Sequence, residues 1–152
     1  MKKNGKILIF AIFVALVIIA IFVVQKIYTA PKIPYLKINN TGIDLEIADT
    51  LEKQITGLSY RESLDQKSGM LFVFPVKEMK SFWMKDMKFS LDIIWIDEDR
   101  IIKIDKSLPI AGPNPDKRYY SSEPVNYVLE VNGGFADLHN IKVGDRVNYF
   151  LK

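Results

Sequence analysis

The chain has 152 residues, with 21 Lys and Arg, 18 Asp and Glu, a single His and no Cys. The lack of Cys excludes disulfide scaffolds, thiol nucleophiles and Cys-ligated metal centres, and one His excludes multi-His metal sites within one chain. The first 30 residues carry four of the bases and no acid, which leaves 17 bases and 18 acids for residues 31–152. This balance argues against a nucleic-acid-binding domain, which needs a basic face.

An uninterrupted apolar segment lies near the N-terminus. Eighteen apolar residues run from Ile7 to Val24, which as a helix would span roughly 27 Å, close to the hydrocarbon thickness of a bilayer. A secretory signal has a shorter apolar region and then a small-x-small cleavage site, and Tyr28 fits poorly at the third position before a cut after Ala30. We therefore expect residues 1–30 to be a cytoplasmic tip with an uncleaved transmembrane signal anchor; a cleaved signal is the alternative.

The bases that flank this segment predict its orientation. Three lysines precede it, at positions 2, 3 and 6, whereas only Lys26 and Lys32 follow it closely. The more positive flank of a membrane helix stays in the cytoplasm. We therefore expect a single-pass membrane protein with a cytoplasmic N-terminus and with residues 31–152 as a domain outside the membrane.

The first elements of this domain are predicted from alternation and turn residues. Residues 35–39 and 43–48 alternate apolar and polar side chains around an Asn-Thr-Gly turn, which predicts a β-hairpin. Asp49 and Glu52 form a D-x-x-E capping box that predicts a short helix, and Gly57 is expected to end it.

The rest of the domain is predicted to be mostly β. Asp97-Glu98-Asp99 is expected to be the turn of a second hairpin. Seven or eight short strands with one or two short helices are typical of a β sandwich or barrel. The expected later strands are residues 70–74, 81–84, 91–96, 100–104, 127–131 and 146–151.

A long loop interrupts the strands between Pro109 and Pro124. It holds four prolines, and Arg118, Tyr119 and Tyr120 follow one another near its end. Loops of this length are uncommon in compact domains and are often functional. Adjacent tyrosines beside an arginine are typical of contact surfaces. The loop is therefore either a rigid crossover or a binding lip that includes these three residues.

Several short motifs, taken in order, resemble those of the uncharacterised family called domain of unknown function 192. The resemblance covers about residues 35–151, and Ser59 departs from it, since the family commonly has Met there. It implies a compact, jelly-roll-like β domain, often behind a signal or an anchor, with no established activity. The motifs that carry it are GLSYRESL at 57–64, GMLFVF at 69–74, FWMKDMKFSLDIIWID at 82–97, YYSSEPVNYVLEVNGG at 119–134 and VGDRV at 143–147.

Four polar positions inside these motifs are candidate site residues: Arg61, Lys85, Asp92 and Glu130. Asp92 and Glu130 share predicted strand faces with apolar residues, and a buried carboxylate needs a partner. Arg61 is the expected partner, because its planar guanidinium can bind a carboxylate at two points. The cluster is either a structural ion-pair network or a polar patch in a cleft, in which the two carboxyls act as acid and base or hold a ligand.

Trp83 is a further candidate, together with the tyrosines of the long loop. Strand alternation over residues 81–85 places Trp83 on the same side as Ser81 and Lys85, which predicts a partly exposed ring. The alternative is a core tryptophan.

The expected function is that of a binding or accessory module of the cell envelope. Its partners would be the membrane, through Ile7–Val24, and an envelope saccharide or another envelope protein, with no nucleic acid, cofactor or metal. One alternative is a hydrolase that uses Asp92 and Glu130. Another is a structural component of a membrane complex.

Overall fold

The computed structural model describes residues 2–28 and 33–151, and within the N-terminal helix it describes side chains only at positions 10 and 12–24. The chain divides into two units, Met1–Lys32 and Ile33–Lys152. The first holds helix α1 (Lys2–Tyr28), and each of its described side chains is exposed. Ala30, after which the alternative cleaved signal would end, lies outside the described residues. Within the described part of the chain, no helix meets the length and apolarity needed to cross a membrane.

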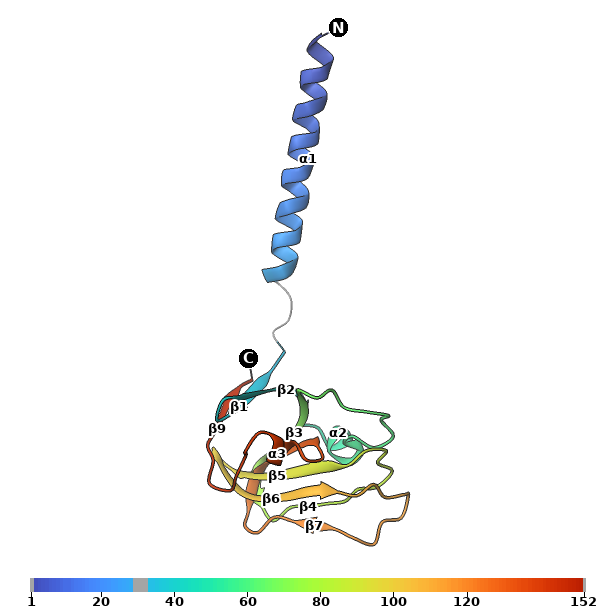
Figure 1. Ribbon diagram of the computed structural model, residues 1–152, viewed down its shortest axis with the longest axis vertical. Helices are drawn as coiled ribbons and strands as arrows, with labels where there is room; N and C mark the ends of the chain where they lie inside the picture. The colour runs from blue at the N-terminus through green and yellow to red at the C-terminus, as the bar shows by residue number, and fades with distance from the viewer. Residues whose placement is uncertain (1, 29–32, 152) are drawn as a thin grey trace. The chain divides into compact units, whose positions relative to one another are not determined.

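The second unit is a mostly β domain built on one mixed sheet of seven strands (Figure 1). The strands lie in the order β6-β5-β8-β3-β2-β1-β9, and all neighbours are antiparallel except β2 and β3. They are β1 (Tyr35–Ile38), β2 (Thr41–Ala48), β3 (Ser68–Glu78), β5 (Leu91–Asp97), β6 (Arg100–Leu108), β8 (Val125–Asn132) and β9 (Val147–Phe150). The predicted mostly β domain is confirmed, and both predicted hairpins are present.

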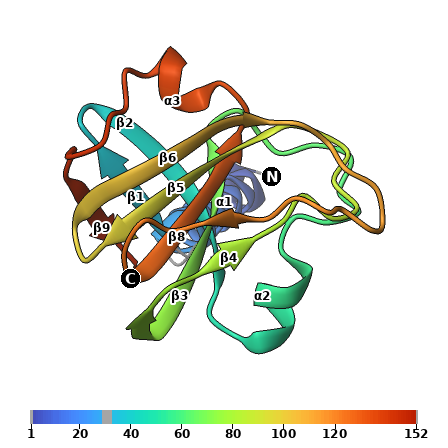
Figure 2. The same ribbon diagram turned by 90° about the horizontal axis from the view of Figure 1, so that it is seen from below.

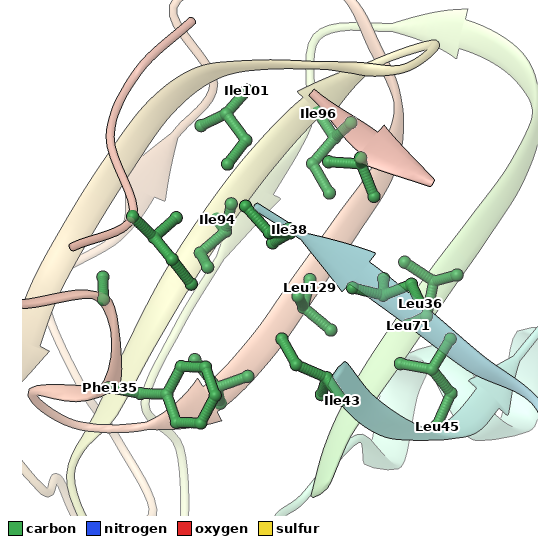
Figure 3. Close-up of a cluster of buried hydrophobic side chains, with 14 residues drawn as sticks. Leu36, Ile38, Ile43, Leu45, Leu71, Ile94, Ile96, Ile101, Leu129 and Phe135 are labelled. Atoms are coloured by element: carbon green, nitrogen blue, oxygen red, sulfur yellow. The ribbon is translucent and has the colours of Figure 1, made fainter. Parts of the chain in front are cut away.

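The sheet curls into a half-barrel rather than forming two stacked sheets (Figure 2). Its two edge strands approach each other at one end through an isolated bridge between Arg100 and Arg146. Inside the curl, apolar side chains from β1 and β2 face those from β5 and β8, as Ile38 and Ile94 do in Figure 3. This first core takes one face of every strand that contributes to it, as the period of two in a strand requires.

A second core covers the opposite face of the central strands. Its largest members include Trp95, Phe72 and Met84. A two-stranded ribbon of β4 (Ser81–Phe82) and β7 (Tyr119–Tyr120) packs over it, with Phe82 edge-on to both Phe72 and Trp95. The predicted loop 109–124 therefore contains a short strand that pairs with β4.

The parallel pair β2–β3 requires a crossover, and this segment carries the short helix α2 (Leu51–Thr56). The helix begins one residue later than the capping box predicts, because Thr50 and not Asp49 accepts the hydrogen bond from the Lys53 N–H. Gly57 ends the helix as expected, and its N–H binds the Lys53 carbonyl. No residue of α2 is buried, so the helix contributes no buried side chain to either core.

Candidate functional site

The crossover after α2 lies over the face of the sheet that carries the second core. On this face, three neighbouring strands place a row of side chains side by side. Glu46 on β2 pairs with Met70 on β3, and Met70 pairs with Glu130 on β8. Residues paired across adjacent strands point to the same side of the sheet. Two carboxyls and the methionine between them therefore form one row beneath the crossover.

Glu130 is the unusual member of this row. It is only 5% exposed, and its Oε2 atom is buried without a hydrogen-bond partner. It lines a cavity of about 30 Å³, together with Leu58, Phe82 and Met87 among others, which is room for about one water. Burial raises the pKa of Glu130 to about 8, and the nearby Arg61 charge opposes this only in part. Its carboxyl therefore keeps its proton at neutral pH.

Gly57 gives the buried carboxyl the space that it occupies. Its φ of +51° is a conformation that side-chain-bearing residues rarely adopt, and a Cβ there would lie 3.3 Å from Phe72 Cζ and 3.8 Å from Glu130 Oε2. Gly57 and Thr56 line the small cavity and also a groove of about 600 Å³ on the other side. The groove and the cavity that holds the buried acid therefore share these two lining residues.

Arg61 binds Glu46 in the groove, so its expected pairing with Asp92 or Glu130 is wrong. Its two terminal nitrogens donate to the two oxygens of Glu46 at 2.8 and 2.5 Å. Hydrogen bonding to Arg61 lowers the pKa of Glu46 despite some burial. Arg61 acts on Glu130 only through its charge. The row therefore holds one carboxylate fixed in its ionised form and one carboxyl kept neutral.

Asp92 lies on the opposite face of the sheet and belongs to a different structure. On β5 it pairs with Val131, whereas its neighbour Ile93 pairs with Glu130. Its carboxylate accepts three backbone N–H bonds of 2.7 to 2.9 Å, from Ser107, Gly134 and Ala136. It thereby fixes the start of α3 (Phe135–Leu138). Asp92 and Glu130 cannot act on one substrate as acid and base, because the sheet separates them.

Trp83 lies at the rim of the small cavity and is 37% exposed, as the alternation predicts. The Arg118 guanidinium lies 4.3 Å and the Lys85 ammonium 5.4 Å from the centre of its ring. Neither cation forms an ion pair within residues 2–28 and 33–151, the described part of the chain. Three sequence-predicted candidates, Trp83, Lys85 and Arg118, are thus brought together.

The two adjacent tyrosines of the long loop, Tyr119 and Tyr120, lie in different environments. Tyr119 is 7% exposed and packs in the second core, so it is not part of an exposed binding lip. It lies there because it pairs with the inward-facing Phe82 across the ribbon. Tyr120, next to it, points outward and is exposed.

Hydrogen bonds connect the crossover after α2 to the segment that follows Trp83. The Ser59 hydroxyl donates to the Lys85 carbonyl at 2.8 Å, and the Tyr60 N–H donates to the Asp86 carbonyl at 2.9 Å. The crossover and the segment that carries Trp83 therefore form a single wall. Among the described residues, no group of three or more His, Asp or Glu is placed to hold a metal ion.

Sequence reasoning missed Glu46 and Gly57 as members of this site. In the sequence, Glu46 is an ordinary polar residue on the outer face of an alternating strand. Gly57 indicates only the end of a helix. The parallel β2–β3 pairing, which brings Glu46 level with Glu130, leaves no local signal. The run of sequence from Gly57 to Arg61 was a signal, because it supplies residues to both the groove and the cavity.

Residues 35–149 match the family described as Uncharacterized ACR, domain of unknown function 192 (DUF192). The chain belongs to the DUF192 family. No curated protein matches it.

Two solved structures resemble the DUF192 domain of this chain. One is a protein of unknown function from Novosphingobium aromaticivorans, at 31% identity and a TM-score of 0.69, over 75% of this chain and 83% of that one. The other is described as a candidate transcription regulator from Sinorhizobium meliloti, at 28% identity and a TM-score of 0.69, over 76% of this chain and 91% of that one. The family and the fold are therefore shown, while the family has no assigned activity.

Proposed function

We propose that this DUF192 protein is a membrane-tethered binding module of the cell envelope, and that its ligand is an anionic saccharide held over Trp83. One observation carries the proposal. A partly exposed indole ring lies at the mouth of a cavity, with the cations of Arg118 and Lys85 beside it and no acid paired to either among the described residues.

The chemistry of this surface suits a charged sugar. A flat aromatic ring offers an apolar surface to the C–H face of a pyranose, and arginine binds carboxylate or phosphate groups through its fork of donors. The adjacent groove of about 600 Å³ has a size usual for ligand sites.

The proposed membrane tether is the apolar N-terminal segment. Eighteen consecutive apolar residues from Ile7 to Val24 follow three lysines and the amino terminus. Every described side chain of this helix is exposed to its surroundings. An apolar helix is stable in lipid, because all its backbone groups are bonded within the helix. The lysines favour a cytoplasmic N-terminus with the domain outside.

Co-sedimentation with purified bacterial sacculi tests the binding function. The full-length protein, in mild detergent, is mixed with sacculi that carry their phosphate-linked anionic polymers and with sacculi stripped of those polymers by acid. We expect binding to the first and at least tenfold weaker binding to the second. Trp83→Ala and Arg118→Gln should each weaken binding by tenfold or more, because each removes one half of the recognition surface.

Val143→Ala is the matched control, since Val143 is an exposed apolar residue in the turn before β9. It should bind as the wild type does. Equal binding by the wild type and Trp83→Ala, or no binding by the wild type, would reject the saccharide proposal. Capture of an envelope protein by the wild type under the same conditions would instead indicate that the partner is a protein.

The placement of the domain is tested separately with a single cysteine. The chain has no Cys, and Asn40 is exposed in the first hairpin turn, so Asn40→Cys creates one reactive thiol. We expect a membrane-impermeant maleimide to label it in intact cells. Labelling only after lysis would place the domain on the cytoplasmic side.

A further inference from the structure

A separate cavity lies between the β1–β2 turn, the segment before β3 and α3. It has a volume of about 300 Å³ and is lined by Asn40, Thr41, Gly42, Lys67, Phe135 and His139. This volume is at the lower end of the range usual for small-molecule sites. None of these residues lines the groove or the small cavity under the crossover, so this cavity is independent of the site described above.

Hydrogen bonds between the segments around this cavity hold it in a preformed shape. The Asn39 side-chain amide donates to Asp145 Oδ2 at 2.8 Å, which joins the β1–β2 turn to the segment that follows α3. The Asp44 N–H donates to the Lys67 carbonyl at 2.9 Å, which joins β2 to the segment before β3. Asp92 fixes the start of α3 through two backbone N–H bonds. The cavity therefore needs no movement of the chain in order to form.

The imidazole ring of His139 is supported by one wall of the cavity. Its centre lies 4.2 Å from the centre of the Phe135 ring, with an angle of 46° between the two planes. Phe135 is only 4% exposed and belongs to the first core, so its ring is a fixed support for the imidazole. His139 itself is half-buried, and its ring is thereby held in place at the cavity.

Every polar side chain that lines the cavity can donate a hydrogen bond, and none has a partner in the described part of the chain. These side chains are Asn40, Thr41, Lys67 and His139. The groove differs, because its two cations, Arg61 and Lys53, are paired with Glu46 and Asp49. The donors of the cavity are therefore free to bind a ligand.

The acids closest to these residues in the sequence have bonds of their own. Asp137, on α3 with Phe135, pairs with Lys106. Asp65 accepts a hydrogen bond from the backbone N–H of Lys67 at 2.9 Å. Among residues 33–151, no Asp or Glu lines the cavity. The cavity therefore presents hydrogen-bond donors and the positive charge of Lys67, with no carboxylate to repel an anion.

We infer that this cavity binds a phosphate group, either as inorganic phosphate or as the phosphate monoester of a small molecule. The four unpartnered donors and the charge of Lys67 carry the inference. It goes beyond the proposed function and does not rest on it, because the cavity shares no residue with the saccharide surface at Trp83.

A phosphate monoester fits this set of donors better than other common anions do. It offers three acceptor oxygens and roughly 1.5 to 2 negative charges at neutral pH. Lysine is a usual phosphate-binding residue, because its ammonium is a compact positive charge with three donors. A carboxylate has only two oxygens and a single charge, so it would leave more of the donors unused.

Nuclear magnetic resonance of His139 tests the inference, because the chain has one histidine and its imidazole signals are therefore assigned at once. Sodium phosphate or glycerol 1-phosphate is added to the full-length protein in mild detergent, at constant pH and ionic strength. We expect a saturable movement of the His139 signals with each of them, and no saturable movement with sodium acetate. The ligand that binds more tightly then identifies the source of the phosphate group.

Lys67→Gln should weaken phosphate binding at least tenfold, because it removes a charged donor from the cavity. Lys142→Gln is the matched control. Lys142 is an exposed lysine in the segment after α3 and does not line the cavity, so this variant should bind phosphate as the wild type does. Both variants should melt at the wild-type temperature, since both side chains are exposed.

Three results would overturn the inference. The first is the absence of saturable movement of the His139 signals with either phosphate ligand. The second is equal phosphate affinity of the wild type and Lys67→Gln, since the lysine would then play no part in binding. The third comes from co-sedimentation with sacculi, in which Lys67→Gln should behave as the wild type does. Loss of this binding would show that the cavity belongs to the saccharide site and is not a separate phosphate site.

Discussion

Two buried carboxyl groups, Asp92 and Glu130, lie on neighbouring strands of the same sheet and differ in almost every other respect. Asp92 is fully buried and its two oxygens accept three backbone N–H bonds. Glu130 is nearly as buried, but its Oε2 has no partner. One faces the turn that begins α3, and the other faces a cavity under the crossover.

This difference separates a structural carboxyl from a candidate site residue. An unpaired polar group in the interior costs about 1–3 kcal/mol, so a fold keeps one only where something offsets the cost or uses the group. Asp92 bonds three donors that would otherwise be unpaired. Glu130 avoids an isolated buried charge by holding a proton, and a neutral acid in a small cavity can donate that proton to a ligand.

The largest effect is expected from Asp92→Ala. Three backbone N–H groups would lose their acceptor at roughly 2 kcal/mol each, so the free energy of unfolding should fall by about 6 kcal/mol. Urea denaturation measures this. Asp92→Asn, which keeps one acceptor oxygen, should lose less. A loss below about 1 kcal/mol for Asp92→Ala would show that these bonds do not hold α3.

The pH dependence of stability should be nearly as large and should come from Glu130. Its pKa rises from 4.5 to about 8 on folding, so the folded state holds a proton that the unfolded state releases in this range. Its contribution is fully present below pH 4.5 and is lost as the pH rises through about 8, by at most about 5 kcal/mol. Glu130→Gln, which stays neutral, should remove this slope. An unchanged slope in Glu130→Gln would assign it to another group.

Gly57→Ala should cost less, about 1–3 kcal/mol, because φ of +51° strains any side-chain-bearing residue and the new Cβ meets Phe72 at 3.3 Å. A thermal melt measures the loss. Gly112→Ala is the matched control, since nothing lies within 4 Å of a Cβ there. Equal melting temperatures for the two variants would show that the fold accommodates a side chain at position 57.

The smallest effect is expected from Arg61→Ala. Arg61 and Glu46 are both partly exposed, so their ion pair should contribute less than about 1 kcal/mol to stability. A loss of about 3–5 kcal/mol would indicate that Arg61 compensates a buried carboxyl, which is the pairing expected from the sequence. Urea denaturation of the single variants and of Arg61→Ala combined with Glu46→Gln distinguishes the two cases.

Local signals in the sequence predicted the local structure well. The Asn-Thr-Gly turn and the acidic turn at 97–99 each join two antiparallel strands, and the glycine after α2 ends it. Alternation predicted the exposed ring of Trp83. These features depend on neighbours within a few residues, so the sequence contains their cause.

The pairings between strands that are distant in the chain could not be predicted from the sequence. Alternation predicted that Asp92 and Glu130 lie in apolar surroundings, but only the pairing of Ile93 with Glu130 places the two carboxyls on opposite faces. The parallel β2–β3 register likewise brings Glu46 into the row and gives Arg61 a different partner. A shift of one residue in either pairing would reverse these assignments, and no local pattern sets it.

Direct titration of the Glu130 carboxyl tests the difference between the two buried acids most sharply. Side-chain carboxyl carbons of the full-length protein are followed by ¹³C NMR from pH 3 to 10, with Glu130→Gln to assign the signal. One carboxyl should titrate near pH 8 and be absent from Glu130→Gln. If every carboxyl of the wild type titrates below about pH 5, as exposed glutamates do, then Glu130 is ionised in the folded protein at neutral pH, which contradicts the account of it as a neutral buried acid.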